Sequence, residues 1–198
     1  TGLIIPIGEF VIKKSIELIV KLKKEFEFDF KIAVNVSPKQ LLNKSFLSFI
    51  KNELISNQVN PEYLEIEITE GVLIDKSEEV SHKLNDLKKM GISLSLDDFG
   101  TGYSSLSYLR KYSFDIIKID KSFIDAQDYN LVKTIISMSH SMNLKVIAEG
   151  IETKEQLLKL QELNCDMGQG YYFSKPIPRN SFLKYLKDNI SLTEKRTL

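Results

Sequence analysis

The stretch LEIEITE at residues 64–70 alternates between apolar and polar side chains, and this alternation decides the fold class. Its leucine and two isoleucines would lie on one face of a strand, and Glu65, Glu67 and Thr69 on the other. SLSLDD at residues 93–98 repeats the pattern. Parallel strands buried on both faces of an open sheet read as continuous apolar runs instead. The alternation therefore favours a (β/α)8 barrel with a polar, wet interior over a doubly wound open sheet.

Six short apolar runs alternate with helical stretches along the chain. Strands are predicted at residues 31–37, 64–70, 93–98, 115–120, 145–150 and 167–173. A helix is predicted before the first strand, over residues 7–25, from apolar residues at helical spacing. Helix boundaries are indicated by capping and stop residues, namely Ser37, Ser45, Ser77, Thr153 and Gly91. No linker or low-complexity segment interrupts this rhythm, so residues 1–198 are predicted to form one α/β domain.

The predicted strands are fewer than the eight of a complete barrel. The sequence begins TGLIIPIGEF, without Met. We therefore expect the first two strands to be absent from this sequence, so that about six of eight are present. The strands near residues 32–36 and 167–173 would then have unpaired edges, which are prone to pairing with another chain.

Composition excludes several classes of function. The chain has 27 Lys and Arg residues against 27 Asp and Glu residues, so its charge favours neither a nucleic-acid polymer nor an anionic membrane. No apolar run approaches the roughly 20 residues of a membrane span, and no signal peptide is visible. The single Cys165 has no partner for an intramolecular disulfide, which is typical of a reducing, cytoplasmic compartment.

Polar or charged side chains end every predicted strand. In chain order they are Asn35, Glu67, Asp97 with Asp98, Lys118 with Asp120, Glu149 with Glu152, and Gln169. Barrel enzymes place their catalytic groups at these strand ends. Several carboxylates at one mouth would raise one another's pKa values unless a cation lay among them. The pattern therefore predicts a divalent metal site.

The type of metal follows from the available ligands. His82 and His140 fall within helical stretches, and no thiolate lies near the predicted cluster. Hard oxygen ligands favour Mg²⁺ or Mn²⁺ over zinc or copper. Two such ions about 3.5 to 4 Å apart suit phosphoryl chemistry.

Taken singly, each element has a structural explanation. Asp97 and Asp98 before a glycine are typical of a turn, and Glu152 is typical of a helix entry. The EITE segment, residues 67–70, is compatible with a solvated edge strand, and Lys118 with a simple ion pair. The coincidence of these elements at successive strand ends favours a functional site.

Six motifs occur in order along the chain. They are VNVS (34–37), EITE (67–70), DDFGTGYSSL (97–106), KIDKSF (118–123), AEGIE (148–152) and QGYYFSKP (169–176). Through them the chain resembles the EAL-domain family of cyclic di-GMP phosphodiesterases, over nearly its whole length. The resemblance implies a TIM-like barrel of the EAL type with one antiparallel strand. It also implies hydrolysis of cyclic di-GMP to linear pGpG with two Mg²⁺ or Mn²⁺ ions in bacterial signalling.

The resemblance also assigns roles to individual residues. It implies metal ligands at Asn35, Glu67, Asp97, Asp98 and Glu149. Glu149 would act at the attacking water and Lys118 would hold and polarise that water, which makes these two the implied catalytic residues. Glu70 would anchor the 97–106 loop, and Glu152 would be a supporting carboxylate. Asp120 and Gln169 would contribute to the hydrogen-bond network around the substrate and water. Lys175 would lie at the guanine-binding edge, where the family often has arginine.

The Glu-Ala-Leu motif that names the family does not occur in this sequence, and we expect it on one of the absent strands. The alternative function is therefore a catalytically inert EAL module that serves as a cyclic di-GMP receptor or an interaction domain. An unrelated magnesium-dependent barrel enzyme is the third. The resemblance further implies a homodimer, with Tyr103 and Leu106 as expected contacts, and an upstream GGDEF or sensor domain.

Overall fold

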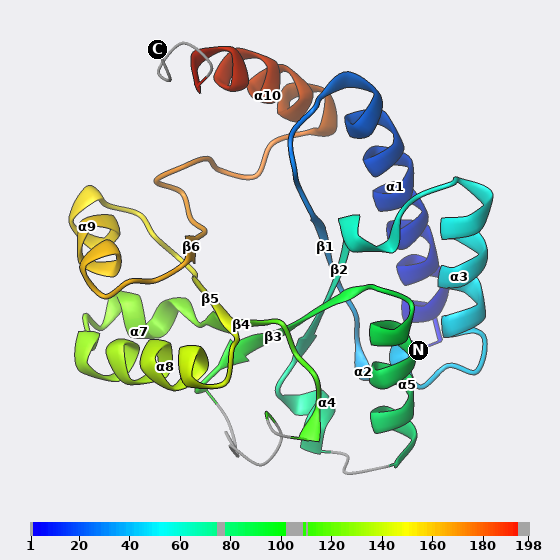
Figure 1. Cartoon of the computed structure of the whole chain (residues 1–198), viewed down its shortest axis with the longest axis horizontal. Helices are drawn as coiled ribbons and strands as arrows, with labels where there is room; N and C mark the ends of the chain where they lie inside the picture. Colours follow the sequence, from blue (N-terminus) through cyan, green and yellow to red (C-terminus); the bar gives the residue numbers. More distant parts are fainter. Residues whose placement is uncertain (1, 75–77, 102–108, 110, 194–198) are drawn as a thin grey trace.

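The computed structural model of the protein describes residues 2–74, 78–101, 109 and 111–193 (Figure 1). Its six strands form one sheet in which the spatial order follows the chain order. They are β1 (Ile32–Asn35), β2 (Leu64–Thr69), β3 (Ser93–Phe99), β4 (Ile116–Ile119), β5 (Lys145–Ala148) and β6 (Met167–Gly168). Neighbouring strands are all parallel, so the antiparallel strand implied by the resemblance is not among these six.

Helices connect the strands and cover the outside of the sheet (Figure 1). They are α1 (Ile4–Glu25), α2 (Pro38–Leu41), α3 (Phe46–Ser56), the 3₁₀ helix η1 (Pro61–Tyr63), α4 (Gly71–Ile74), α5 (Glu78–Lys89), α7 (Lys121–Asp125), α8 (Tyr129–Ser141), α9 (Lys154–Glu162) and α10 (Arg179–Thr193). The sheet curls into a half-barrel, which confirms the predicted α/β barrel architecture. Among the described residues, no helix is both long and apolar enough to cross a membrane.

The core lies between the outer face of the sheet and the helices. Ile66 and Leu94 on neighbouring strands are completely buried, as are Ile12 and Ile16 of α1. All four belong to one continuous apolar cluster. Burying such a side chain stabilises the fold by about 1.5–3 kcal/mol, which explains why the alternation in the strands specifies which face meets the helices.

The polar face of the strands differs from the prediction. We expected a wet face, but Glu65 and Glu67 are 4% and 7% exposed. The curl of the sheet brings the inward side chains of adjacent strands together, so they shield one another from water. A hollow of about 620 Å³ remains on the concave side, lined in part by Glu65, Glu67 and Gln169.

Local sequence signals account for most element boundaries. Ser37 and Thr153 each form a capping box, with Gln40 and Gln156 respectively at the third helical position. Gly91 follows α5 with a φ of +90°, as a helix stop requires. Ser45 does precede α3, although its side chain makes no capping hydrogen bond to that helix. Ser77 lies outside the described residues.

Two elements differ in length from the prediction. The first helix begins at Ile4 instead of residue 7. β6 covers only Met167–Gly168, against a predicted strand over residues 167–173. The backbone of Gly170 packs so closely against Ile151 that a Cβ would lie 2.1 Å from the Ile151 carbonyl oxygen. The chain stays close to the segment after β5, where the backbone N–H of Ile151 donates to the carbonyl oxygen of Gln169 over 3.0 Å, although only two residues of β6 pair as a strand.

Candidate metal centre and active site

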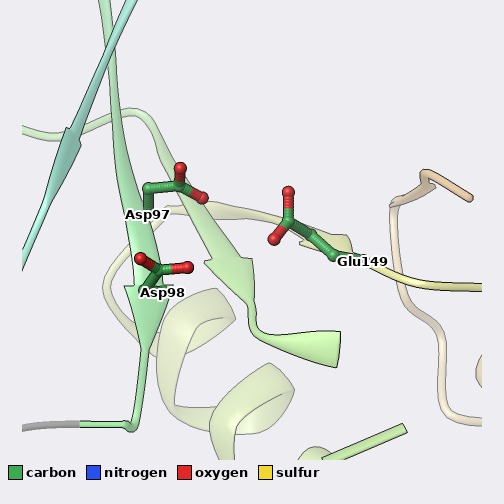
Figure 2. Close-up of side chains that lie close together, drawn as sticks. All are labelled: Asp97, Asp98 and Glu149. Carbon is green, nitrogen blue, oxygen red and sulfur yellow. The ribbon is translucent and has the colours of Figure 1, made fainter. Parts of the chain in front are cut away.

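Two consecutive aspartates reach the same site because β3 contains a bulge. Leu96 pairs with Ile117 and Phe99 with Ile119, so Asp97 and Asp98 together oppose one residue of β4. A bulge of this kind re-aims a side chain that would otherwise point to the opposite face. Asp98 has a φ of +55°, which accompanies this change. Figure 2 shows both aspartates on the side of the sheet that faces Glu149.

Asp97, Asp98 and Glu149 form a three-carboxylate group (Figure 2). One carboxylate oxygen from each residue lies within 4.8 Å of the others. Glu149 follows β5 directly, and its backbone N–H donates to the carbonyl oxygen of Ile119 over 3.1 Å. The group therefore lies where β3 and β5 end, at the carboxyl edge of the sheet, as the sequence predicts. These spacings are suitable for holding a metal ion.

Lys118 lies at the centre of the buried charges. Its ammonium nitrogen is 2.7 Å from Glu149 Oε1, 2.9 Å from Asp97 Oδ1 and 3.0 Å from Glu67 Oε1. Lys118 itself is 3% exposed. One ammonium thus faces three carboxylates, and the charge of Asp98 lies nearby. The site carries more negative charge than Lys118 can compensate, which a divalent cation would correct.

The pKa values of the site reflect this imbalance. Burial raises the pKa of Glu67 and of Glu149 above the ordinary value, and the lowering effect of Lys118 does not outweigh it. Burial, followed by repulsion from Asp97, raises the pKa of Asp98. Burial lowers the pKa of Lys118, but its hydrogen bonds to Glu149 and Asp97 raise it further than burial lowers it. Lys118 is therefore fully protonated at neutral pH.

The structure places the two other predicted metal ligands on neighbouring strands. Glu67 contacts Lys118 but is not a member of the three-carboxylate group. Asn35 ends β1, is exposed, and pairs in register with Glu67. Their roles as metal ligands stay predictions.

The supporting residues have diverse surroundings. Glu70 is buried, and both of its carboxylate oxygens lack a hydrogen-bond partner among the described residues. Residues 102–108 of the loop that it is predicted to anchor lie outside the described residues, as do Tyr103 and Leu106. Asp120 caps α7 by accepting from the backbone N–H of Ser122 over 3.0 Å.

A smaller hollow of about 270 Å³ adjoins the site. Its lining includes four residues predicted from the sequence, namely Asp120, Glu149, Glu152 and Gln169. Lys121 and Tyr171 also line it, and the sequence reasoning missed both. Lys121 is the residue after the Asp120 cap, so its place next to a strand end was the available signal.

A model of the EAL domain family matches residues 1–176 of this chain. The chain belongs to the EAL domain family. It is 39% identical over 191 residues to the signaling protein YkoW of Bacillus subtilis, covering 94% of this chain and 24% of YkoW. It is 35% identical over 191 residues to the cyclic di-GMP phosphodiesterase NbdA of Pseudomonas aeruginosa, covering 94% of this chain and 24% of NbdA. This EAL domain thus spans about a quarter of the length of these curated relatives.

Solved structures support the same fold for this EAL domain. A PaMucR phosphodiesterase in complex with c-di-GMP is 34% identical, with a TM-score of 0.88 over 92% of this chain and 76% of that one. The EAL enzyme Bd1971, bound to cAMP and cyclic di-GMP, is 31% identical, with a TM-score of 0.89 over 94% of this chain and 53% of that one. The family and barrel predicted from the six motifs are therefore confirmed.

Proposed function

We propose that this chain is a cyclic di-GMP phosphodiesterase domain that hydrolyses cyclic di-GMP to linear pGpG. The observation that carries the proposal is the three-carboxylate group of Asp97, Asp98 and Glu149 next to the buried Lys118. The relative NbdA is named a cyclic di-GMP phosphodiesterase, and the similar PaMucR structure is a complex with c-di-GMP. A module that only bound the dinucleotide would have no need of a protonated lysine held against a carboxylate at the reacting end of the strands.

The donor set fits divalent metal ions. All the groups are hard oxygen donors, which suit Mg²⁺ or Mn²⁺, and the excess negative charge around Lys118 favours a cation. The residues that would hold two ions are Asn35, Glu67, Asp97, Asp98 and Glu149. When bound, the ions would neutralise phosphate charge and acidify water, which is the usual metal contribution to phosphoryl transfer.

Residues of the chain itself would orient the attacking water and accept its proton. Glu149 would orient the attacking water and accept its proton, since the raised pKa of this carboxylate suits a general base. Lys118, held 2.7 Å from Glu149, would keep that carboxylate aligned and donate a hydrogen bond to the water. Attack at phosphorus forms one P–O bond and breaks the bond to the 3′ oxygen, which leaves protonated by solvent.

Other residues would complete the substrate site. Asp120, Glu152 and Gln169 line the small hollow next to Glu149, so they are suited to contact the substrate or its ordered water. Lys175 would contact the guanine edge, and Glu70 would anchor the loop after β3. Residues 1–198 would form one EAL-type barrel domain that acts as a homodimer under the control of a GGDEF or sensor domain.

Chromatographic measurement of cyclic di-GMP turnover in Mn²⁺ tests the proposal. We expect the full-length protein to release pGpG, and Glu149→Gln to lower that rate at least about 100-fold. Glu155→Gln, on the exposed first turn of α9, is the matched control and should keep it. Tight binding of cyclic di-GMP in calorimetry without turnover would overturn the enzyme proposal and support the receptor alternative.

A further inference from the structure

We propose that α7 is a clamp that fixes the distance between the turn after Asp98 and the turn after Glu149, through Phe123 and Lys121. The inference rests on the proposed function, because it concerns the same metal site. Phe123 and Lys121 would act as positioning residues. Neither belongs to the three-carboxylate group.

Phe123 packs against the turn that follows the two aspartates. Gly100 has a φ of +97°, and a Cβ on it would lie 2.9 Å from two ring carbons of Phe123. The ring therefore lies directly against the glycine backbone, at a distance that only glycine permits. Ile135 of α8 approaches the same position at 3.9 Å. The bulge at Asp98 is thus held two residues away by a rigid aromatic contact.

Lys121 packs against the second turn, which follows β5. Gly150 has a φ of +70°, and a Cβ on it would lie 2.3 Å from Cβ of Lys121 and 3.1 and 3.2 Å from the next two carbons of its stem. The aliphatic part of Lys121 therefore covers the glycine next to Glu149. Its ammonium reaches Glu152 Oε1 at 3.6 Å and Asp125 at 3.5 Å.

The helix that carries both contacts is itself fixed to the site. Asp120 caps α7 immediately after β4, the strand that contains Lys118. Ile124 is completely buried, and the carbonyl oxygen of Phe123 accepts from the backbone N–H of Asp128 over 3.1 Å. One short helix thus contacts the two turns on either side of β4, and any shift of α7 would change the separation of Asp98 from Glu149.

Positioning predicts effects on metal affinity beyond those on stability. Partners outside the ligands typically change metal affinity or activity by about 10- to 100-fold. We expect Phe123→Leu and Lys121→Ala each to weaken Mn²⁺ binding in calorimetry by about tenfold or more. Phe49→Leu and Lys133→Ala are controls, because Phe49 also packs against the core and Lys133 is exposed on α8. Each control should leave the Mn²⁺ affinity unchanged, whatever its effect on the melting temperature.

Further variants separate packing from charge. Lys121→Met keeps the stem over Gly150 but removes the ammonium, so the clamp predicts an affinity close to that of the wild type. An equal loss in Lys121→Met and Lys121→Ala would overturn the clamp, because the ion pair with Glu152 would then be responsible. Gly100→Ala should weaken Mn²⁺ binding less in the Phe123→Leu background than in the wild type, since leucine lacks the ring carbons that a Cβ would meet.

The outcome for the clamp is distinguishable from that for the proposed function. Mn²⁺ affinity is measured without substrate, so lower affinity in both α7 variants supports the clamp even if cyclic di-GMP is not hydrolysed. If the wild type hydrolyses the substrate, and Phe123→Leu and Lys121→Ala both keep the wild-type Mn²⁺ affinity and turnover number, the clamp is overturned and the proposed function is not. A wild type without measurable Mn²⁺ affinity would also overturn the clamp, and turnover would still judge the function separately.

Discussion

The ammonium of Lys118 lies 2.7 Å from a carboxylate oxygen of Glu149, and the two side chains are only 4% and 17% exposed. Asp97 and Glu67 contact the same ammonium. A buried charge is tolerated only when it is paired, and removing one partner of such a pair is more costly than never having had it. Lys118 is therefore as important to the folding of the metal-free site as to its chemistry.

Lys118→Met should destabilise the metal-free protein at neutral pH by about 3 kcal/mol, because the two buried carboxylates of Glu67 and Asp97 and the half-buried one of Glu149 lose their nearest cation. Lys118→Arg keeps a positive charge, so its free energy of unfolding should fall less than that of Lys118→Met. Urea denaturation at about pH 7.5 in a chelator measures both effects. The difference between Lys118→Met and the wild type should be smaller at about pH 5 than at about pH 7.5, because burial raises the pKa values of Glu67 and Glu149, and both bind protons more readily at the lower pH. An equal difference at the two pH values would contradict the charge explanation.

Metal binding should stabilise the protein more as the pH rises. Burial raises the folded-state pKa values of Glu67 and Glu149 above the reference of 4.5. Such acids bind more protons when folded, so their contribution to stability is present below about pH 4.5 and is lost as the pH rises through the folded values. Mn²⁺ replaces those protons. At a free concentration of about 100 times its Kd, Mn²⁺ should add about 2.7 kcal/mol to the free energy of unfolding.

Thermal scans at about pH 5 and pH 7.5, with Mn²⁺ or with EDTA, check this expectation. The rise in melting temperature on adding Mn²⁺ should be larger at the higher pH, and EDTA should reverse it. A larger rise at pH 5 would argue against ligation by these carboxylates. Glu149→Gln serves as the matched variant, because it removes one carboxylate charge while keeping the shape of the side chain, and it should reduce the rise in melting temperature.

At the opposite, amino-terminal edge of the sheet, Asp166 supports β5. Its Oδ2 accepts from the backbone N–H of Val146 over 2.8 Å and lies 2.8 Å from Nε2 of His140. Burial raises the pKa of Asp166, but the hydrogen bonds from His140 and Val146 lower it further, and the net value lies below the ordinary 3.8. This contribution to stability is present above about pH 3.8 and is lost as the pH falls through the folded pKa.

Asp166→Asn should therefore lower the free energy of unfolding by about 1–2 kcal/mol at neutral pH. Asp86→Asn is the control, since Asp86 forms an ion pair with the exposed Lys89 on the same helix. Urea denaturation as a function of pH measures both variants. The cost of Asp166→Asn should decline below about pH 3.8, and a cost that grows in acid would show that the carboxylate is not the stabilising group.

Much of the fold was predictable because its signals are local. Alternation in residues 64–70 specifies a strand and its core face without reference to any neighbour. The capping box at Thr153 likewise depends on residues three positions apart, and the structure has both. The order of polar strand ends along the chain then becomes an order in space, because each parallel strand pairs with the next. This is why Asp97 and Glu149 were expected together.

The features that the sequence did not reveal depend on contacts between distant segments. The bulge at Asp97 and Asp98 exists only relative to the register with β4, so alternation within β3 places Asp98 on the wrong face. The burial of Glu65 depends on the curl of the whole sheet. Lys121 against Gly150 joins residues that are separated by β5 and α8, and no local pattern predicts such a contact.

Asp98 combines a strained backbone with an unfavourable charge, and this combination gives the sharpest test of its role. Its φ of +55° is one that Asp and Asn adopt more readily than other residues except glycine. Asp98→Asn keeps that tolerance and removes the repulsion from Asp97 that helps to raise the pKa of Asp98. We therefore expect the metal-free stability of Asp98→Asn to rise while its Mn²⁺ affinity falls.

Asp98→Ala should instead lower both the metal-free stability and the Mn²⁺ affinity. The backbone contribution to the loss of stability should be about 1–2 kcal/mol, because alanine disfavours positive φ. Urea denaturation in a chelator and calorimetry with Mn²⁺ separate the two quantities for each variant. If Asp98→Asn kept full Mn²⁺ affinity, Asp98 would not be a metal ligand, and the bulge in β3 would need another explanation. A stability rise coupled to an affinity loss is the combination that a ligand held at a repulsive, strained position must produce.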